Sequence, residues 1–323
     1  MNGSMVDRVL AGDYRAVARL ITLVENGEPE AIPYMRQLFP HTGRCLSIGI
    51  TGAPGAGKST LADRLAGYYR NLDRKVGIIA VDPTSPFTGG AILGDRIRMQ
   101  SRSLDQGTFI RSMATRGNLG GLSRATADVL LIMDAAGFDI VLVETVGVGQ
   151  DEVEIARTAQ LTLVLLVPGM GDDVQAMKAG IMEIGDIFVI NKADHVGVER
   201  IEAELNALLS TSTRPDGWKP EVVRTVAPDG IGVDRCAQAV EAWRIAQKSS
   251  PYQQEKALQV QKERLLDLVR SEIQRNMLRD PLTANRMTEF ALQIAARRMD
   301  PYSAAEKLLA LWRGTAHPDA PLS

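Results

Sequence analysis

The residues best suited to chemistry lie in the stretch GAPGAGKS, which runs from Gly52 to Ser59. The spacing Gly-x4-Gly-Lys-Ser is that of a phosphate-binding loop, whose backbone N–H groups turn inward toward phosphate oxygens. We expect Lys58 to reach the β- and γ-phosphates and to serve catalysis, and the Ser59 hydroxyl to ligate Mg²⁺. The predicted phosphate contacts are Gly52, Ala53, Pro54, Gly55, Ala56, Gly57, Lys58, Ser59 and Thr60.

A carboxylate, Glu144, follows the unbroken apolar run IVLV at 140–143. We expect this run to be a central strand that ends beside the phosphate loop, where Glu144 serves catalysis and holds Mg²⁺ or one of its waters. Gly147 brings a backbone N–H to the γ-phosphate, since it has no side chain to block the approach. Gln150 is a candidate for orienting the attacking water, but it lies further along the chain than the usual catalytic Gln.

Two further carboxylates, Asp82 and Asp95, bracket the stretch PTSPFTGGAILGD at 83–95. A loop of this length and Pro/Gly content inside a compact domain is typically functional. We expect both carboxylates to approach Mg²⁺ or its waters, and Asp95 to take part in catalysis. The alternative stays open that Asp82 caps a turn and Asp95 caps a helix in DRIRMQSRS.

The sequence NKAD at 191–194 follows another apolar run and predicts guanine recognition. The Asp194 carboxylate can accept hydrogen bonds from guanine N1–H and the 2-amino group, neither of which adenine offers. We expect Lys192 to lie along the base plane and Asn191 to support the loop. The tripeptide Thr225, Val226, Ala227 is expected to offer a backbone N–H to guanine O6. Together these loops predict GTP as substrate, GDP as product and Mg²⁺ as the cofactor.

Seven short apolar runs must position these loops: CLSIGI, KVGIIAV, TFIRSM, DIVLVE, LTLVLLV, DIFVIN and VVRTVA. Few polar residues alternate within them, which is typical of strands buried on both faces. Helix-length segments between the runs predict a mainly parallel seven-stranded sheet of the α/β class, a P-loop NTPase fold with N- and C-terminal helical extensions. In such sheets ligands bind beyond the carboxyl ends of the strands, so the loops above are expected to converge.

Helical patterns flank the sheet on both sides. Apolar residues between Val6 and Val24 form a helical stripe, and the segment PHTGR closes it; residues 1–4 are set aside. After Trp243 the strands stop, and a later helix is predicted to begin with Asp300 as N-cap and Pro301 at its first position. We predict an N-terminal helical segment (1–43), a GTPase domain (44–248) and a C-terminal helical extension (249–323). That extension either packs on the sheet domain or pairs with a second copy.

Composition excludes several classes of protein. The chain has 323 residues, 45% hydrophobic content and a formal net charge of −2 without a Lys/Arg block, so we predict no nucleic-acid or membrane surface. Cys45 and Cys236 lie far apart, and the three His are not clustered, which argues against disulfides and zinc or nickel sites. The longest apolar stretch is too short to span a bilayer, and no signal peptide is visible. We expect a soluble, cytoplasmic protein.

With these loops in place, the sequence resembles the MeaB/ArgK family of P-loop GTPases. The resemblance covers nearly the whole chain and includes VDPTSPFTGGAILGDRIRM, ATRGNLGGLS, VETVGVGQ and VPGMGDDVQAMKAGIMEIGDI. It implies a homodimeric GTPase that attends an adenosylcobalamin-dependent acyl-CoA mutase of the methylmalonyl-CoA mutase type. The nucleotide state of the GTPase would gate cofactor delivery to the mutase, and the GTPase would protect the mutase. The sequence IGDI stands where many members have IADI.

The resemblance also implies roles for particular residues. It assigns Mg²⁺ binding and hydrolysis to Asp95 and Glu144, with Asp82 nearby. An additional switch loop maps onto GDDVQAMK, whose signalling side chains are Asp172, Gln175 and Lys178. Intrinsic hydrolysis is expected to be slow until the mutase activates it. Two alternatives remain in view: an ATP-dependent kinase or transport ATPase, and a nickel-insertion GTPase, whose His- or Cys-rich motifs this sequence lacks.

Overall fold

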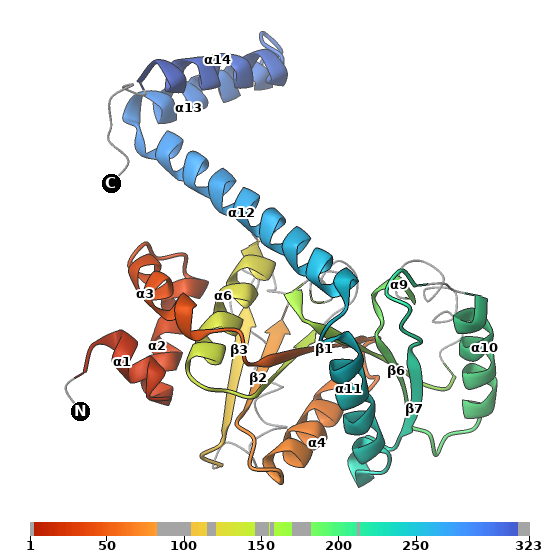
Figure 1. Ribbon diagram of the computed structural model, residues 1–323. Coiled ribbons are helices and arrows are strands. Elements are labelled where there is room, and N and C mark those ends of the chain that lie inside the picture. The colour runs from red at the N-terminus through yellow and green to blue at the C-terminus, as the bar shows by residue number, and fades with distance from the viewer. Residues whose placement is uncertain are drawn as a thin grey trace. The chain divides into compact units, whose positions relative to one another are not determined.

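A computed structural model of the chain describes residues 3–82, 105–114, 121–145, 155, 158–169, 182–211 and 214–315. The chain divides into two compact units, Met1–Glu255 and Lys256–Ser323. Figure 1 shows the strands of the first unit gathered into one sheet. Among the described residues, no helix is both long and apolar enough to cross a bilayer.

All seven predicted strands are present and pair in parallel in a single sheet. They are β1 (Leu46–Gly52), β2 (Val76–Asp82), β3 (Thr108–Ala114), β4 (Ile140–Thr145), β5 (Leu161–Leu166), β6 (Ile187–Asn191) and β7 (Glu221–Thr225). Their order across the sheet is β3-β2-β4-β1-β5-β6-β7. Every residue of β1, β4, β5 and β6 is buried, as the unbroken apolar runs predicted.

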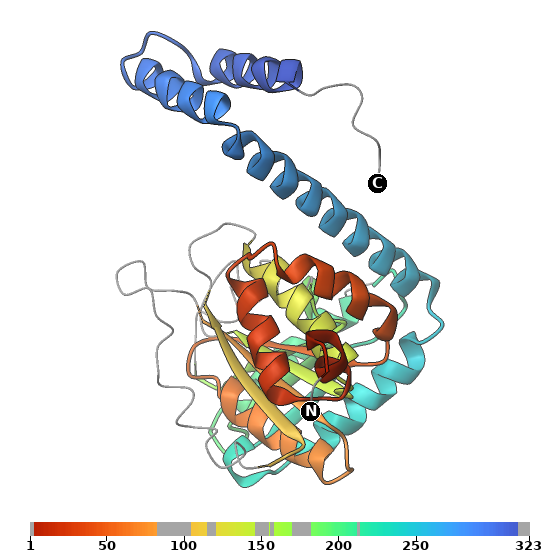
Figure 2. The ribbon, with the colours of Figure 1, turned by 90° about the vertical axis from the view of Figure 1, so that its left-hand side faces the viewer.

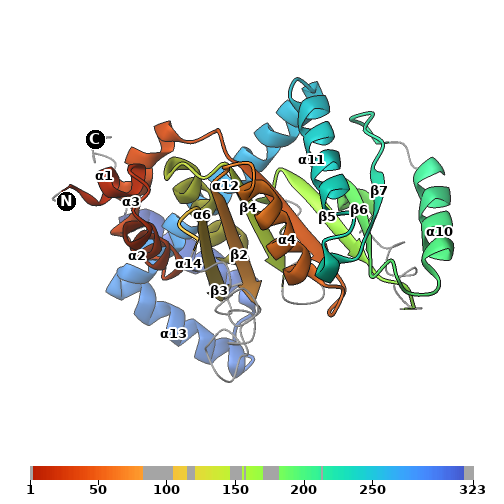
Figure 3. The ribbon, with the colours of Figure 1, turned by 90° about the horizontal axis from the view of Figure 1, so that it is seen from below.

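Helices cover both faces of the sheet (Figure 3). One face packs against α4 (Lys58–Arg70) and α11 (Val233–Gln247), through buried side chains such as Leu61 and Val240. The other face packs against α6 (Gly121–Ala135) and the N-terminal helices on one side and against α10 (Val198–Thr211) on the other. The short elements are η1 (Phe39–His41), α9 (Met182–Ile184) and η4 (Ala227–Asp229).

The N-terminal stripe forms two helices rather than one: α1 (Met5–Leu10) and α2 (Tyr14–Glu25), followed by α3 (Ala31–Leu38). The chain breaks at Gly12, whose φ of 73° is left-handed, and Asp13 then caps α2 by accepting from the N–H of Arg15 at 2.9 Å. Ser4, which the sequence interpretation set aside, forms a capping box with Asp7 at the start of α1.

The N-terminal helices lie beside α6 (Figure 2). A carboxylate fixes this arrangement: Asp134, near the end of α6, accepts from the backbone N–H groups of Gly43, Arg44 and Cys45 just before β1. At the start of β3, Arg70 holds Asp105 by a bidentate pair with N–O distances of 2.8 and 3.1 Å. These contacts fix where β1 and β3 enter the sheet.

The second unit contains most of α12 (Pro251–Arg279), together with α13 (Pro281–Ala295) and α14 (Pro301–Thr315). The Asp300 carboxylate accepts from the backbone N–H of Ser303 at 2.9 Å, which confirms the predicted cap of α14. Few side chains of this unit are buried; Thr283 and Ala304 are examples. Its three helices therefore leave much apolar surface exposed.

Candidate functional site

The phosphate-loop sequence connects β1 to α4, as the motif requires. Gly52 can only be glycine here, because a Cβ would lie 2.3 Å from the carbonyl oxygen of Leu165. Gly57, the N-cap of α4, has a φ of 94°, and a Cβ there would lie 2.4 Å from Asn191 Nδ2. No side chain caps α4 among the described residues, so the first backbone N–H groups of this helix are available to an anionic ligand.

Lys58 lies at the first position of α4 with 8% of its surface exposed. Its ammonium donates to the carbonyl oxygens of Gly52, at 2.6 Å, and Ala53, at 3.1 Å. A charge this deeply buried must be hydrogen-bonded. Those two carbonyls therefore hold the cation at the phosphate loop, where it can stabilise bound phosphate oxygens.

Asn191, at the end of β6, joins the phosphate loop to the segment after β7. Its Nδ2 donates to the carbonyl oxygen of Ala56 at 2.8 Å, and its Oδ1 accepts from Thr225 Oγ1 at 3.0 Å and from the Ala227 N–H at 3.1 Å. Asn191 is 1% exposed. The sequence predicted a supporting role for this residue, but only the structure shows that it touches both loops.

The rest of NKAD follows at the same edge of the sheet, where Lys192 and Ala193 are half-buried and Asp194 is exposed. Lys192 has a φ of 56°, a conformation that non-glycine residues rarely adopt, and the N–H of Ala193 donates to the carbonyl oxygen of Thr225 at 3.0 Å. This turn leaves the Asp194 carboxylate in solvent, 3.8 Å from His195 Nε2. The carboxylate is thus accessible to the base of a nucleotide.

The backbone N–H groups expected to meet guanine O6 are already hydrogen-bonded within the protein. The N–H of Val226 donates to the carbonyl oxygen of Ile231 at 3.0 Å, and that of Ala227 donates to Asn191. A contact from either group to O6 would therefore be shared with its protein partner.

Glu144 lies on β4, one residue before its end, and is fully buried. Ile140 and Leu142 pack in the core cluster of α4, and side chains alternate along a strand, so Glu144 faces α4 as well. Ser59 is the second residue of that helix and is half-buried. A carboxylate and a hydroxyl on one face form an oxygen-only donor set of the kind that Mg²⁺ takes together with phosphates and water.

Several predicted site residues lie outside the described residues. These are Asp95, Gly147, Gln150, Asp172, Gln175 and Lys178. Asp82 is the last residue of β2, the strand next to β4, but its side chain is not among those described.

Sequence reasoning missed Arg64, which lies on α4 two turns after the phosphate loop. Its Nη2 donates to the carbonyl oxygen of Pro228, which is 164 positions away in the chain. Nothing in the local sequence signals this contact, because an exposed Arg on a helix is commonplace.

The loops predicted to bind phosphate and base thus meet at the carboxyl edge of one parallel sheet. The family model described as methylmalonyl Co-A mutase-associated GTPase MeaB matches residues 17–281. The chain belongs to the MeaB family. Membership of this family of P-loop GTPases supports GTP hydrolysis as the activity of the chain.

The relatives of this MeaB-family chain span bacteria, archaea and animals. It is 47% identical to a protein of Pyrococcus abyssi that is named as a GTPase, over 96% of each chain. It is 39% identical to the GTPase ArgK of Escherichia coli, over 76% of each, and 32% identical to the mitochondrial methylmalonic aciduria type A homolog of Caenorhabditis elegans, over 95% of this chain and 82% of the other. The crystal structure of a LAO/AO transport system kinase matches with a TM-score of 0.68 and 27% identity, over 96% of each chain.

Proposed function

We propose that this MeaB-family GTPase selects GTP over ATP through Asp194. The observation that carries this proposal is the Asn191 side chain, which ties the phosphate loop to the segment after β7. Because of this tie, a nucleotide held by its phosphates at Lys58 has its base directed toward the exposed Asp194 carboxylate. A carboxylate accepts from guanine and meets no donors in the same place on adenine.

Mg²⁺ is proposed to bind between the phosphates and the carboxyl edge of the sheet. Ser59 and Glu144 supply oxygen ligands directly or through water, and Asp82 and Asp95 complete the set. The ion would neutralise charge on the phosphates during hydrolysis. The protein's own part is to fix the position of the phosphates through the phosphate loop and Lys58, and to place Glu144 on the same face.

The partner is proposed to be an adenosylcobalamin-dependent acyl-CoA mutase, whose cofactor loading the nucleotide state gates and which the GTPase protects. The matched family model is described as associated with methylmalonyl Co-A mutase, and one relative is named for methylmalonic aciduria. Asp172, Gln175 and Lys178 are the proposed carriers of the signal between the nucleotide and the mutase.

Hydrolysis is proposed to be slow until the mutase binds. GTPases without an arginine finger in their own chain turn over at about 10⁻⁴ to 10⁻³ per second. The test is a phosphate-release assay with GTP or ATP and Mg²⁺, with and without the purified mutase. We expect GTP to be preferred, the mutase to accelerate turnover, and Lys178→Ala to lower that acceleration without abolishing GTP binding.

Each outcome of this assay decides a different part of the proposal. Equal turnover of GTP and ATP would favour the alternative of an ATP-dependent kinase or transport ATPase. Equal GTP turnover with and without the mutase would remove the chaperone role and leave the GTPase activity standing.

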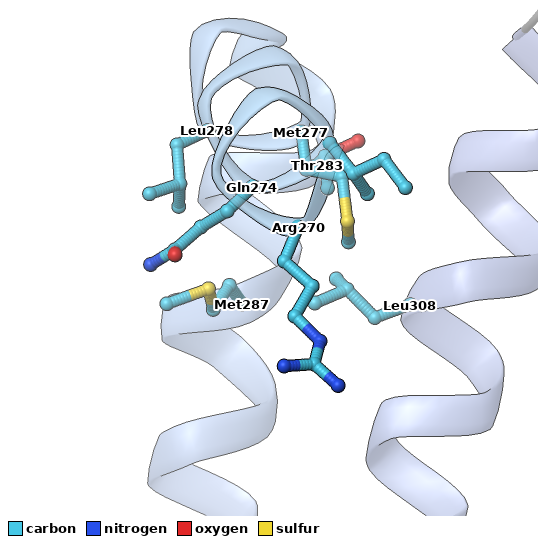
Figure 4. A pocket seen from close by; sticks show the side chains of 8 residues that line it. Arg270, Gln274, Met277, Leu278, Thr283, Met287 and Leu308 are labelled. Atoms are coloured by element: carbon cyan, nitrogen blue, oxygen red, sulfur yellow. The ribbon is translucent and has the colours of Figure 1, made fainter. Parts of the chain in front are cut away.

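The C-terminal extension is proposed to join two copies of the chain. Its exposed apolar side chains include Leu258, Leu265, Val269 and Leu292. A pocket of about 300 Å³ lies among α12, α13 and α14, with Met277, Met287 and Leu308 in its lining (Figure 4). Exposed apolar side chains beside an apolar pocket are typical of protein interfaces.

A further inference from the structure

The turn that follows β7 lies between the base loop and the helix of the phosphate loop. It consists of η4 and closes by hydrogen bonds from Asp229 N–H to the carbonyl oxygen of Val226 and from Gly230 N–H to that of Ala227. Ala227 is fully buried in the same core cluster as Leu61 of α4. The turn therefore rests against the helix that begins at the phosphate loop.

Two side chains from other elements hold this turn by hydrogen bonds to its backbone. Asn191 accepts from the N–H of Ala227, and Arg64 donates to the carbonyl oxygen of Pro228, the next residue. Arg64 lies six positions after Lys58 on α4, and Asn191 also binds the carbonyl oxygen of Ala56. The contacts thus close a ring from the phosphate loop through Asn191 and the turn to Arg64, and back along α4.

We propose that Arg64 is a positioning residue for base recognition, which fixes η4 (Ala227–Asp229) relative to the phosphate loop. The proposal rests on the proposed GTPase function, because the turn flanks the loop that carries Asp194. Arg64 touches neither phosphate nor base in this scheme. It acts through Pro228 and, across one peptide unit, through the Ala227–Asn191 contact.

The physical reason is that a helix is rigid over two turns, so Arg64 holds a fixed position relative to the phosphate loop at the start of α4. With Arg64 in place, two contacts fix the distance between the phosphate loop and the turn: one from Asn191 and one from Arg64. Without it, the turn loses one of the two side-chain contacts that link it to the phosphate loop and its helix, and part of the binding free energy is spent on ordering the turn when a base binds. The variant therefore loses affinity for a nucleotide, which carries a base, but keeps its affinity for phosphates alone.

The test compares two ligands on the full-length protein with Mg²⁺: GTP, and inorganic tripolyphosphate, which lacks a base. Titration calorimetry measures both Kd values for wild type, Arg64→Met, Arg64→Lys and a control, Arg74→Met. Methionine keeps the length of the stem and removes the donors. Arg74 is also exposed and pairs with Asp139 at 3.3 Å beyond the other end of α4.

We expect Arg64→Met to raise the Kd for GTP about 2- to 13-fold, the range for losing one hydrogen bond of ordinary net strength. The Kd for tripolyphosphate should stay at the wild-type value, Arg64→Lys should recover part of the GTP affinity, and Arg74→Met should change neither ligand. Thermal melting curves check that each variant is folded.

The proposal is overturned if Arg64→Met binds GTP as tightly as wild type, or if it loses tripolyphosphate affinity by the same factor as GTP affinity. In the second case Arg64 would support the phosphate loop alone. A wild-type protein that binds ATP as tightly as GTP, while still binding tripolyphosphate, would instead contradict the proposed guanine selectivity.

Discussion

At the scale of single residues, base selectivity depends on one exposed carboxylate. Asp194→Asn replaces an acceptor by an amide that can donate, which suits the 2-oxo group of xanthine better than the 2-amino group of guanine. We expect kcat/KM for GTP to fall by at least about a hundredfold, because a site that loses its hydrogen-bond match discriminates strongly. The value for xanthosine triphosphate should rise. A variant that keeps the wild-type ratio of the two substrates would show that Asp194 does not bind the base.

Glu144 has a different predicted role, because it is fully buried on the face of the sheet that α4 covers. Glu144→Gln keeps the shape and removes the charge. We expect GTP turnover to fall by about ten- to a thousandfold, the range for losing one preorganised electrostatic group, while nucleotide affinity falls less. Single-turnover kinetics and equilibrium binding separate the two effects. Unchanged turnover would mean that the carboxylate serves the fold alone.

Two buried threonines make a matched pair for testing hydroxyl groups. Within the described part of the chain, Thr126 Oγ1 meets no hydrogen-bond partner, whereas Thr108 Oγ1 donates to Asp105 Oδ2 at 3.0 Å. Valine has nearly the same shape as threonine. We expect Thr126→Val to leave the free energy of unfolding unchanged or raise it, and Thr108→Val to lower it by about 1 kcal/mol. Urea denaturation measures both, and a loss of stability in Thr126→Val would reveal a partner for that hydroxyl.

At the scale of elements, the entry of β3 into the sheet depends on an ion pair. Arg70 lowers the pKa of Asp105 to about 2, with help from the backbone N–H of Gly107. Because the pKa of Asp105 is lower in the folded state, the ionised carboxylate stabilises the fold at pH values above its unfolded-state pKa, which is near 4. This stabilisation is lost as the pH falls toward 2. Because the side chains are 22% and 31% exposed, solvent screening keeps the contribution modest.

The pH dependence follows from that sign. We expect Asp105→Asn to be less stable than wild type at pH 7, and the gap between the two urea midpoints to narrow as the pH falls below about 4. The control Asp234→Asn, on an exposed position of α11, should show no such narrowing. A gap that widens on acidification would contradict the assigned ion pair.

At the scale of the whole molecule, the second unit cannot bury its own apolar side chains. On α12, Leu258, Leu265 and Val269 are 56%, 62% and 46% exposed and recur at intervals of seven and four, which places them on one face. Three helices with so few buried side chains have too small a core to be stable without a covering surface. In a dimer with two-fold symmetry, each copy of the chain would cover the exposed apolar surface of the other.

The resulting prediction concerns the oligomeric state. We expect wild-type protein to be a dimer by light scattering, and the double variant Leu265→Gln, Val269→Gln to have a dimer Kd on the order of a hundredfold higher or more, since each buried aliphatic side chain contributes about 1.5–3 kcal/mol. Glu263→Gln, which points to the opposite side of α12, should leave the dimer intact. A wild-type monomer at micromolar concentration would contradict the proposal.

The sequence by itself determined the features that depend on residues close together along the chain. The central strands were visible as apolar runs because strands buried on both faces contain few polar residues. The prediction of two buried faces was wrong for the edge strand β7, in which Arg224 is exposed. The phosphate loop and NKAD were recognisable because each works through consecutive backbone and side-chain groups, and α14 was predicted to begin at Asp300 and Pro301 from local capping chemistry. The break between α1 and α2 is a local feature that was missed, because the apolar stripe continues across Gly12 and outweighed the signal of a Gly-Asp pair.

Only the tertiary structure decided which of these features meet. The order β3-β2-β4-β1-β5-β6-β7 places β4 and β5 on either side of the phosphate-loop strand, and no periodicity in the sequence encodes that order. The contacts from Asn191 to Ala56 and from Arg64 to Pro228 join residues 135 and 164 positions apart. Such contacts exist because the packed sheet brings the carboxyl ends of its strands to one edge, and packing acts on distance in space rather than on distance along the chain.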